Sequence, residues 1–283
     1  MYKYDISNYA PNDEFNRLRL HGWRLSIGDT LKRAQQIFHA QLGLFIGYFV
    51  VAYLILIVGS LILSCVPFIG NFAGSVLSVC LYAGYYIVSF KISQEQNVEF
   101  ADFFEGFKKG LPLGLYAIVS TFIIALGAIP FAIMFVMVGV FSNPEVFTKT
   151  ITDNPIFLGL FVIASLFFGI YALYISAMYL LAPYLITFSN LSFWDAMEIS
   201  RKTMRKNMSI GILFLIVSFL INLLGVLALL VGLLYTVPLT LIAGYVFYDI
   251  LLQQNGNIGA ETNNSDMPPK TGDFREGSPL DQF

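Results

Sequence analysis

Residues 192–207 read SFWDAMEISRKTMRKN, and residues 208–250 read MSIGILFLIVSFLINLLGVLALLVGLLYTVPLTLIAGYVFYDI. The second run holds one charged residue, Asp249, near its end. A single helix of 43 residues would be about 64 Å long, roughly twice the hydrocarbon thickness of a bilayer. The run must therefore fold back on itself. We expect the turn at 232–238, with Pro238 just inside the returning helix.

The composition indicates a membrane protein. Charged residues make up 12% of the 283 residues and hydrophobic residues 57%, whereas soluble domains carry about 25% charged residues. A bilayer takes roughly 20 residues to cross, and six apolar stretches are long enough: 44–64, 72–92, 111–141, 156–188, 210–231 and 232–252. The sequence therefore predicts an all-α integral membrane protein with six transmembrane helices. Its net charge of −2 argues against a nucleic-acid partner.

Polar ends flank the predicted membrane domain, which covers residues 26–252. Residues 1–25 lack the apolar run of a cleavable signal peptide, so we expect the first span to act as the insertion signal. Residues 253–283 are rich in Gly, Asn, Pro and Ser without apolar periodicity, which predicts a disordered tail. The third and fourth spans are unusually long, and we expect kinks at Pro130 and Pro183.

The distribution of basic residues predicts the topology. Fifteen of the sixteen Lys and Arg residues fall on one side of the predicted spans, and only Lys149 falls on the other. Because cytoplasmic loops carry an excess of basic residues, we expect both termini in the cytoplasm.

Three amphipathic helices, each followed by spans, align on Asp29, Asp102 and Asp195, which predicts a threefold repeat of units 26–92, 99–188 and 192–252. The expected apolar faces are Ile27, Leu31, Ala34 and Phe38; Phe100, Phe104, Phe107 and Leu111; and Phe193, Met197, Ser200 and Met204. The alternative is that any amphipathic helix before a span shows such a face.

Two further features accompany the predicted repeat. Ser26 and Ser192 precede their aspartates by three residues, as helix caps do, whereas the second unit has Glu99 there and is expected to lack that cap. The pairs Gly43/Gly47 and Gly110/Gly114 are spaced for close helix packing.

The third amphipathic helix carries a compact basic patch: Arg201, Lys202, Arg205 and Lys206, with Glu198 placed to pair with the first two. We expect the three helices to lie in the membrane interface, apolar face down, with basic groups toward lipid phosphates. Two interpretations stay open for the patch. It either only fixes the topology, or it binds anionic lipid headgroups or a partner.

Few polar groups are predicted inside the spans. Asn222 falls near the middle of the fifth span and is expected to form an interhelical hydrogen bond, with lining of a substrate path as the alternative. Lys91 and Asp249 fall near cytoplasmic ends of spans, where snorkelling is cheap. No ionisable residue is expected at mid-membrane depth, which argues against an ion-coupled carrier. Several tyrosines are candidates for a polar cavity or for interfacial belts: Tyr82, Tyr85, Tyr86, Tyr171, Tyr174 and Tyr179.

The sequence has no pattern typical of catalysis. Its two histidines, His21 and His39, precede the first span, and Cys65 and Cys80 lie in apolar stretches as expected for buried thiols. Metal-ligand spacings, P-loops and GxGxxG motifs are absent from the sequence. We therefore expect no enzyme activity, no cofactor, and no catalytic, cofactor-binding or metal residues.

Four stretches carry a family resemblance: SFWDAMEISRK (192–202), INLLGVLALLVGLLYTVPLT (221–240), FADFFEGFKKGLPLGL (100–115) and the step Ala182-Pro183-Tyr184. They resemble a widespread bacterial family of six-span integral membrane proteins of unknown function, similar to the membrane domain of some glycerophosphoryl diester phosphodiesterases. The resemblance implies a multi-pass protein of the bacterial cytoplasmic (inner) membrane. It implies no hydrolysis, because the phosphodiesterase domain is not in this sequence. It also implies no oxygenase, a label that some members carry, because two histidines cannot supply its iron site.

We therefore expect a non-enzymatic membrane protein that supports envelope or lipid homeostasis or acts as an accessory to other membrane proteins. Its expected partners are membrane lipids, including anionic headgroups, and other membrane proteins or further copies of the chain. The alternative is a transporter or permease for a small or lipidic substrate.

Overall fold

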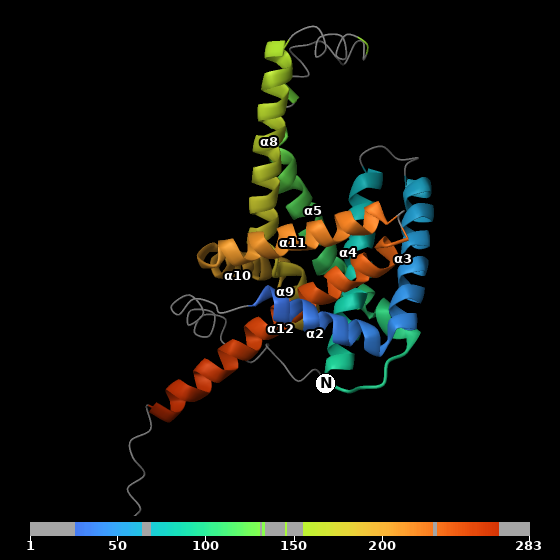
Figure 1. The fold of residues 1–283 in the computed structure, drawn as a ribbon, viewed down its shortest axis with the longest axis vertical. Helices are drawn as coiled ribbons and strands as arrows, with labels where there is room; N and C mark the ends of the chain where they lie inside the picture. Colours follow the sequence, from blue (N-terminus) through green and yellow to red (C-terminus); the bar gives the residue numbers. More distant parts are fainter. Residues whose placement is uncertain are drawn as a thin grey trace, which may run out of the picture.

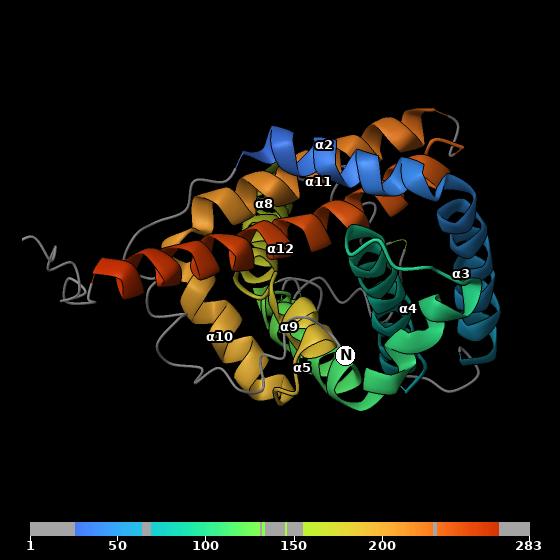
Figure 2. The same cartoon turned by 90° about the horizontal axis from the view of Figure 1, so that it is seen from below.

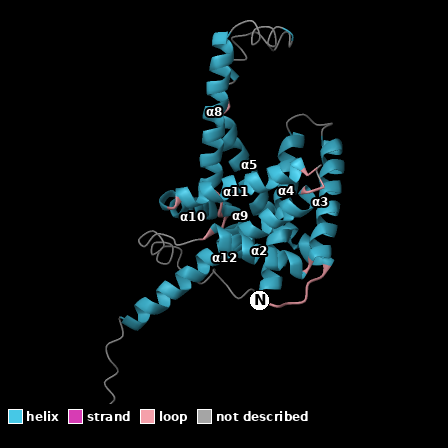
Figure 3. Ribbon diagram, in the orientation of Figure 1, coloured by secondary structure: helices cyan, strands magenta, loops and turns pink. Residues whose placement is uncertain are grey.

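A computed structural model describes residues 26–63, 69–130, 132–133, 145, 155–228 and 231–265. Every regular element among these residues is a helix (Figure 3), so the all-α prediction is confirmed. In chain order the elements are α2 (Ile27–Ala40), α3 (Leu42–Leu63), α4 (Ile69–Ser93), the 3₁₀ helix η2 (Phe100–Lys109), α5 (Gly110–Leu126), α8 (Pro155–Met178), α9 (Ala182–Phe188), α10 (Phe193–Lys206), α11 (Met208–Leu227) and α12 (Leu233–Ser265). The predictions for residues 1–25, Cys65, Lys149 and 266–283 lie outside the described residues.

The described part of the chain holds six helices that are long and apolar enough to cross a membrane: Leu42–Ile62, Ala73–Ser93, Phe100–Leu126, Leu158–Phe188, Met208–Leu227 and Leu233–Leu251. This confirms the prediction of six helices of membrane-spanning length and composition. Two of the six are central, because 56% of the most apolar part of α4 and 50% of that of α12 is buried, against 6% to 22% for the others. The remaining spans leave most of their apolar surface outward.

The six span-length helices do not run in one direction. In Figures 1 and 2, α3, α4 and α8 run along or oblique to the long axis of the molecule, whereas the α11–α12 hairpin runs across it, with α2 lying along α12. The third predicted unit is therefore oriented differently from the first two. The equivalence of the three units stays a prediction.

Both predicted proline breaks are present. α5 ends at Leu126, whose carbonyl would need an N–H at Pro130, four residues on, and proline has none. α8 ends at Met178. The carbonyl of the next residue, Tyr179, would likewise need an N–H at Pro183, four residues on, and finds none. The helical path resumes in α9 after a turn at 179–181.

The ends of α12 differ from the prediction. The hairpin turn lies before Leu233 rather than at 232–238, so Pro238 falls inside α12. Gly225 and Gly232 allow this tight turn, since a Cβ on Gly232 would lie 2.7 Å from the Gly225 carbonyl oxygen. At its other end α12 continues to Ser265, where an irregular tail was predicted from 253. The apolar part of α12 supplies the helix nucleus, so residues 253–265 only add to a helix that already exists.

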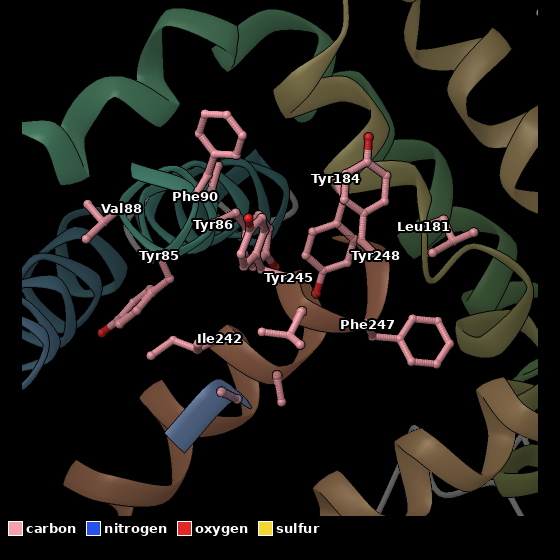
Figure 4. Packing of buried hydrophobic residues seen from close by; sticks show 14 of the residues in the cluster. Tyr85, Tyr86, Val88, Phe90, Leu181, Tyr184, Ile242, Tyr245, Phe247 and Tyr248 are labelled. Carbon is pink, nitrogen blue, oxygen red and sulfur yellow. The ribbon is translucent and has the colours of Figure 1, made fainter. Parts of the chain in front are cut away.

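The core between α4, α9 and α12 is aromatic (Figure 4). The rings of Tyr86 and Tyr184 lie 4.3 Å apart, and those of Tyr184 and Tyr248 are stacked at 5.6 Å. Tyr85 and Tyr86 are 2% and 5% exposed, so they are core residues. Tyr82 and Tyr174 are exposed instead, and the tyrosines proposed from the sequence therefore do not line one cavity.

Close helix packing occurs at only one of the two predicted glycine pairs. A Cβ on Gly114 would lie 3.0 Å from Val76 of α4, and one on Gly110 would lie 3.8 Å from Cys80. Around Gly43 and Gly47 there is open space, so the prediction is wrong for that pair.

The tightest contact between α4 and η2 involves a glycine pair that the sequence analysis did not single out. A Cβ on Gly84 would overlap the Phe103 carbonyl oxygen, and one on Gly106 would overlap the Cys80 carbonyl oxygen.

The apolar faces of α2 and α10 are as predicted, but that of η2 is not. Phe107 and Leu111, expected on its inner face, are 43% and 77% exposed, whereas Phe103 and Gly106 are buried. The reason is that a 3₁₀ helix has three residues per turn, so residues three apart share a face. At the start of η2 the Asp102 carboxylate accepts a 2.9 Å hydrogen bond from the Glu99 N–H, a capping contact that the sequence pattern did not indicate.

Candidate functional site

Helix α10 begins at a serine cap. The Ser192 hydroxyl accepts the Asp195 N–H at 3.2 Å and donates to the Asp195 carboxylate at 2.7 Å. These bonds satisfy the first turn of the helix and place an acidic group at its positive end. These bonds fix the residue at which α10 begins. Because side chains follow one another around a helix at constant spacing, they also fix the directions of the later side chains of α10.

The apolar face of α10 packs on protein. Met197 and Met204 are 3% and 0% exposed, and the fully buried Ser200 hydroxyl donates to the Met178 carbonyl at 2.9 Å and accepts the Leu181 N–H at 3.2 Å. Ser200 thus satisfies backbone groups freed by the break between α8 and α9. The prediction that α10 rests with its apolar face on lipid is wrong, because α8 and α9 occupy that face.

The same correction holds for α2, whose apolar face packs on α12. The rings of Phe38 and Tyr235 lie 5.0 Å apart, and the Tyr235 hydroxyl lies 3.2 Å from His39 Nε2. Both helices are docked on the membrane domain by intramolecular contacts.

The predicted basic patch lies on the opposite, outer face of α10. Arg201 donates to both carboxylate oxygens of Glu198 at 2.7 Å, and Lys202 Nζ lies 3.3 Å from one of them. The hydrogen bond from Arg201 is the main reason that the pKa of Glu198 falls to about 2, and the same bond raises the pKa of Arg201. Arg205 and Lys206 are exposed beside this pair. Four cations and one carboxylate share the face, so it is positive at neutral pH.

A small, open pocket of about 50 Å³ adjoins the patch. Its lining comes from α5, the α8–α9 turn and the start of α10: Ile123, Tyr179, Trp194, Met197 and Glu198. Trp194 is 63% exposed. The pocket therefore joins apolar and aromatic walls to the charged rim that Glu198 shares with Arg201.

Asn222 links the two helices of the α11–α12 hairpin. Its Nδ2 donates to the Thr240 hydroxyl at 3.1 Å and to the Ser218 carbonyl at 2.9 Å. Its Oδ1 atom is buried and has no partner among the described residues. The contact is one of packing between neighbouring helices.

Lys91 and Asp249 do not snorkel as predicted. Asp249 is 3% exposed, and its carboxylate pairs with Arg33 of α2 at 2.8 Å. Lys91 Nζ lies 2.7 Å from Asp102 and 3.3 Å from Glu105. Each charge near the end of a central span is thus paired with oppositely charged residues of an amphipathic helix. Neither ion pair was predicted from the sequence. A single carboxylate such as Asp249 in a long apolar run does, however, indicate that a basic residue lies beside it.

The described residues contain no group of three or more His, Cys, Asp or Glu side chains that would hold a metal ion. Cys80 is a buried free thiol, and His21 and Cys65 lie outside the described residues. Comparisons with protein-family models, with curated proteins and with solved structures find no match to this chain.

Proposed function

We propose that this chain is a non-enzymatic, multi-pass membrane protein that binds anionic phospholipid headgroups at the outer face of α10 and supports lipid homeostasis of the bacterial inner membrane. The observation that carries the proposal is the exposed cationic face of α10 beside an apolar pocket. The apolar side of the helix is already packed on protein, and its cationic side faces outward. Lipid phosphates are the anions present at high density next to a membrane domain.

Glu198 has a structural part in this proposal. It binds Arg201 through two hydrogen bonds, which fix the guanidinium at the mouth of the pocket. Lys202, Arg205 and Lys206 add three further positive charges to this exposed face. Each basic residue near an anionic leaflet contributes about 1 kcal/mol, so the three together contribute about 3 kcal/mol.

The test is a triple variant, Lys202→Gln/Arg205→Gln/Lys206→Gln, which keeps the Glu198–Arg201 pair. The matched control is Lys32→Gln/Lys108→Gln, which removes exposed lysines from α2 and η2. Native mass spectrometry of protein extracted in nanodiscs would compare the bound lipids. We expect the triple variant to lose its enrichment in anionic lipids while the control retains it. Unchanged enrichment in the triple variant would refute the proposal.

The proposed orientation places both termini in the cytoplasm and α10 at the cytoplasmic leaflet. Fifteen of the sixteen basic residues on one side of the spans support it. Reporter fusions within 142–155 should report the periplasm, and fusions at 94–98 and 207 the cytoplasm. A cytoplasmic signal from 142–155 would contradict this orientation, whatever the lipid content.

A further inference from the structure

The 3₁₀ helix η2 is ten residues long, whereas most such helices run for three or four. Its sequence, FADFFEGFKK, repeats every three residues, which matches the three residues per turn of a 3₁₀ helix. The helix therefore has three distinct faces. One carries Phe103 and Gly106, one carries Asp102, Glu105 and Lys108, and one carries Ala101, Phe104 and Phe107.

The first face is buried against the rest of the protein. The Phe103 ring is fully buried and stacks on Tyr48 with ring centroids 4.1 Å apart. Gly106 lies so close to the Cys80 carbonyl that a side chain would not fit. These contacts fix the side on which η2 is attached.

The second face is held by ion pairs. Asp102 and Glu105 both bind Lys91, and Lys108 Nζ lies 2.8 Å from Glu105. With the buried face and the ionic face both engaged, the rotation of η2 about its axis is set. The third face turns only partly outward: Phe107 is exposed, whereas Phe104 is half-buried against the core, with its ring 5.6 Å from that of the buried Tyr48.

That third face is apolar, and it continues into a membrane span. Phe104 and Phe107 are stacked with ring centroids 6.5 Å apart, and Phe107 is 43% exposed. At helical spacing after Phe107 the outward residues of α5 are Leu111, Leu115, Ile118 and Phe122, all exposed. One uninterrupted apolar row therefore runs from η2 down the outer side of the span.

We infer that the Phe107 edge of η2, which is continuous with the outward row of α5, inserts into the boundary between headgroups and acyl chains of the bilayer that α5 crosses. The row is continuous with apolar surface that only lipid can cover along a peripheral span. Lys108, which follows Phe107 directly, is paired with Glu105 and belongs to the ionic face. A row one residue wide is too narrow for a stable contact with a second copy, which takes about 800 Å² from each partner.

The inference concerns η2 and does not depend on lipid binding at α10. Its test uses a background in which Trp23 and Trp194 are replaced by Phe, with Phe107→Trp as the only tryptophan. The protein is reconstituted in vesicles of phosphatidylcholine and phosphatidylglycerol containing lipids brominated at a shallow or a deep acyl position. Lys108→Trp, on the ionic face, is the matched control, and Leu111→Trp, at the next exposed position of the row, is the second variant should Phe107→Trp fail to fold.

We expect blue-shifted emission and strong quenching by the shallow bromines at position 107, and redder emission with weaker quenching at 108. Equal quenching of both positions by aqueous iodide would overturn the inference. Shielding of position 107 from bromine and iodide alike would also overturn it, since a second copy or another protein would then cover the face.

Discussion

The ion pair between Arg33 and Asp249 joins an early amphipathic helix to the last span, and its two partners differ in burial. The Arg33 Nη2 and Asp249 Oδ2 atoms lie 2.8 Å apart, and the side chains are 34% and 4% exposed. Asp249 therefore depends on its partner for stabilisation of its charge, whereas water still reaches part of the guanidinium. Removing one member or the other should have different consequences.

The structure sets the expected magnitudes. Arg33→Gln leaves a buried carboxylate without this cation, and breaking a buried pair in this way costs about 3–5 kcal/mol. Asp249→Asn leaves a cation that is one-third exposed, and because water solvates it we expect a loss of about 1 kcal/mol, as for a surface pair. The double variant should lose less than the sum of the two, by about 0.5–3 kcal/mol.

The free energy of unfolding would be measured in bicelles by steric trapping for the two single variants, the double variant and the native protein. Lys32→Gln, an exposed neighbour of Arg33, is the control and should change little. Equal losses for Arg33→Gln and Asp249→Asn, or a larger loss for Asp249→Asn, would show that burial of the carboxylate does not dominate this pair.

Two further predictions follow from the packing and from the pKa of Glu198. Gly84→Ala should cost about 1–3 kcal/mol in thermal-melt assays because the Phe103 backbone cannot move aside, whereas Gly43→Ala, which faces open space, should be neutral or stabilising by up to about 1 kcal/mol. A lowered pKa means that ionised Glu198 stabilises the fold above its ordinary pKa of about 4.3, and this stabilisation is lost as the pH falls toward 2. Melts between pH 6 and about 2.5 should show this loss in the native protein and not in Glu198→Gln, and parallel curves would contradict it.

What the sequence could predict depended on local backbone chemistry. The number of spans follows from apolar length, and the breaks follow from the missing N–H groups of Pro130 and Pro183. The caps at Ser26 and Ser192 are equally local. None of these features requires knowledge of what lies nearby in space.

The failures share a physical cause, which is that they depend on neighbours distant in sequence. Gly43/Gly47 and Gly110/Gly114 have the same spacing, but only the second pair has a helix against it. The helical period of 3.6 residues predicts the wrong buried face for η2, although the sequence FADFFEGFK shows a repeat of three residues. The apolar face of α10 predicted burial correctly, but amphipathicity alone does not tell whether lipid or protein covers it.

The docking of α2 on α12 has a consequence for biogenesis. The ribosome makes α2 first among the described helices, and its apolar face and Arg33 meet their partners only once α12 has been synthesised. Before α12 is synthesised, the basic, amphipathic helix α2 lies at the membrane surface without its partner. Assembly of the membrane domain is therefore complete only after the last span has been inserted, because α2 can pack on α12 only then.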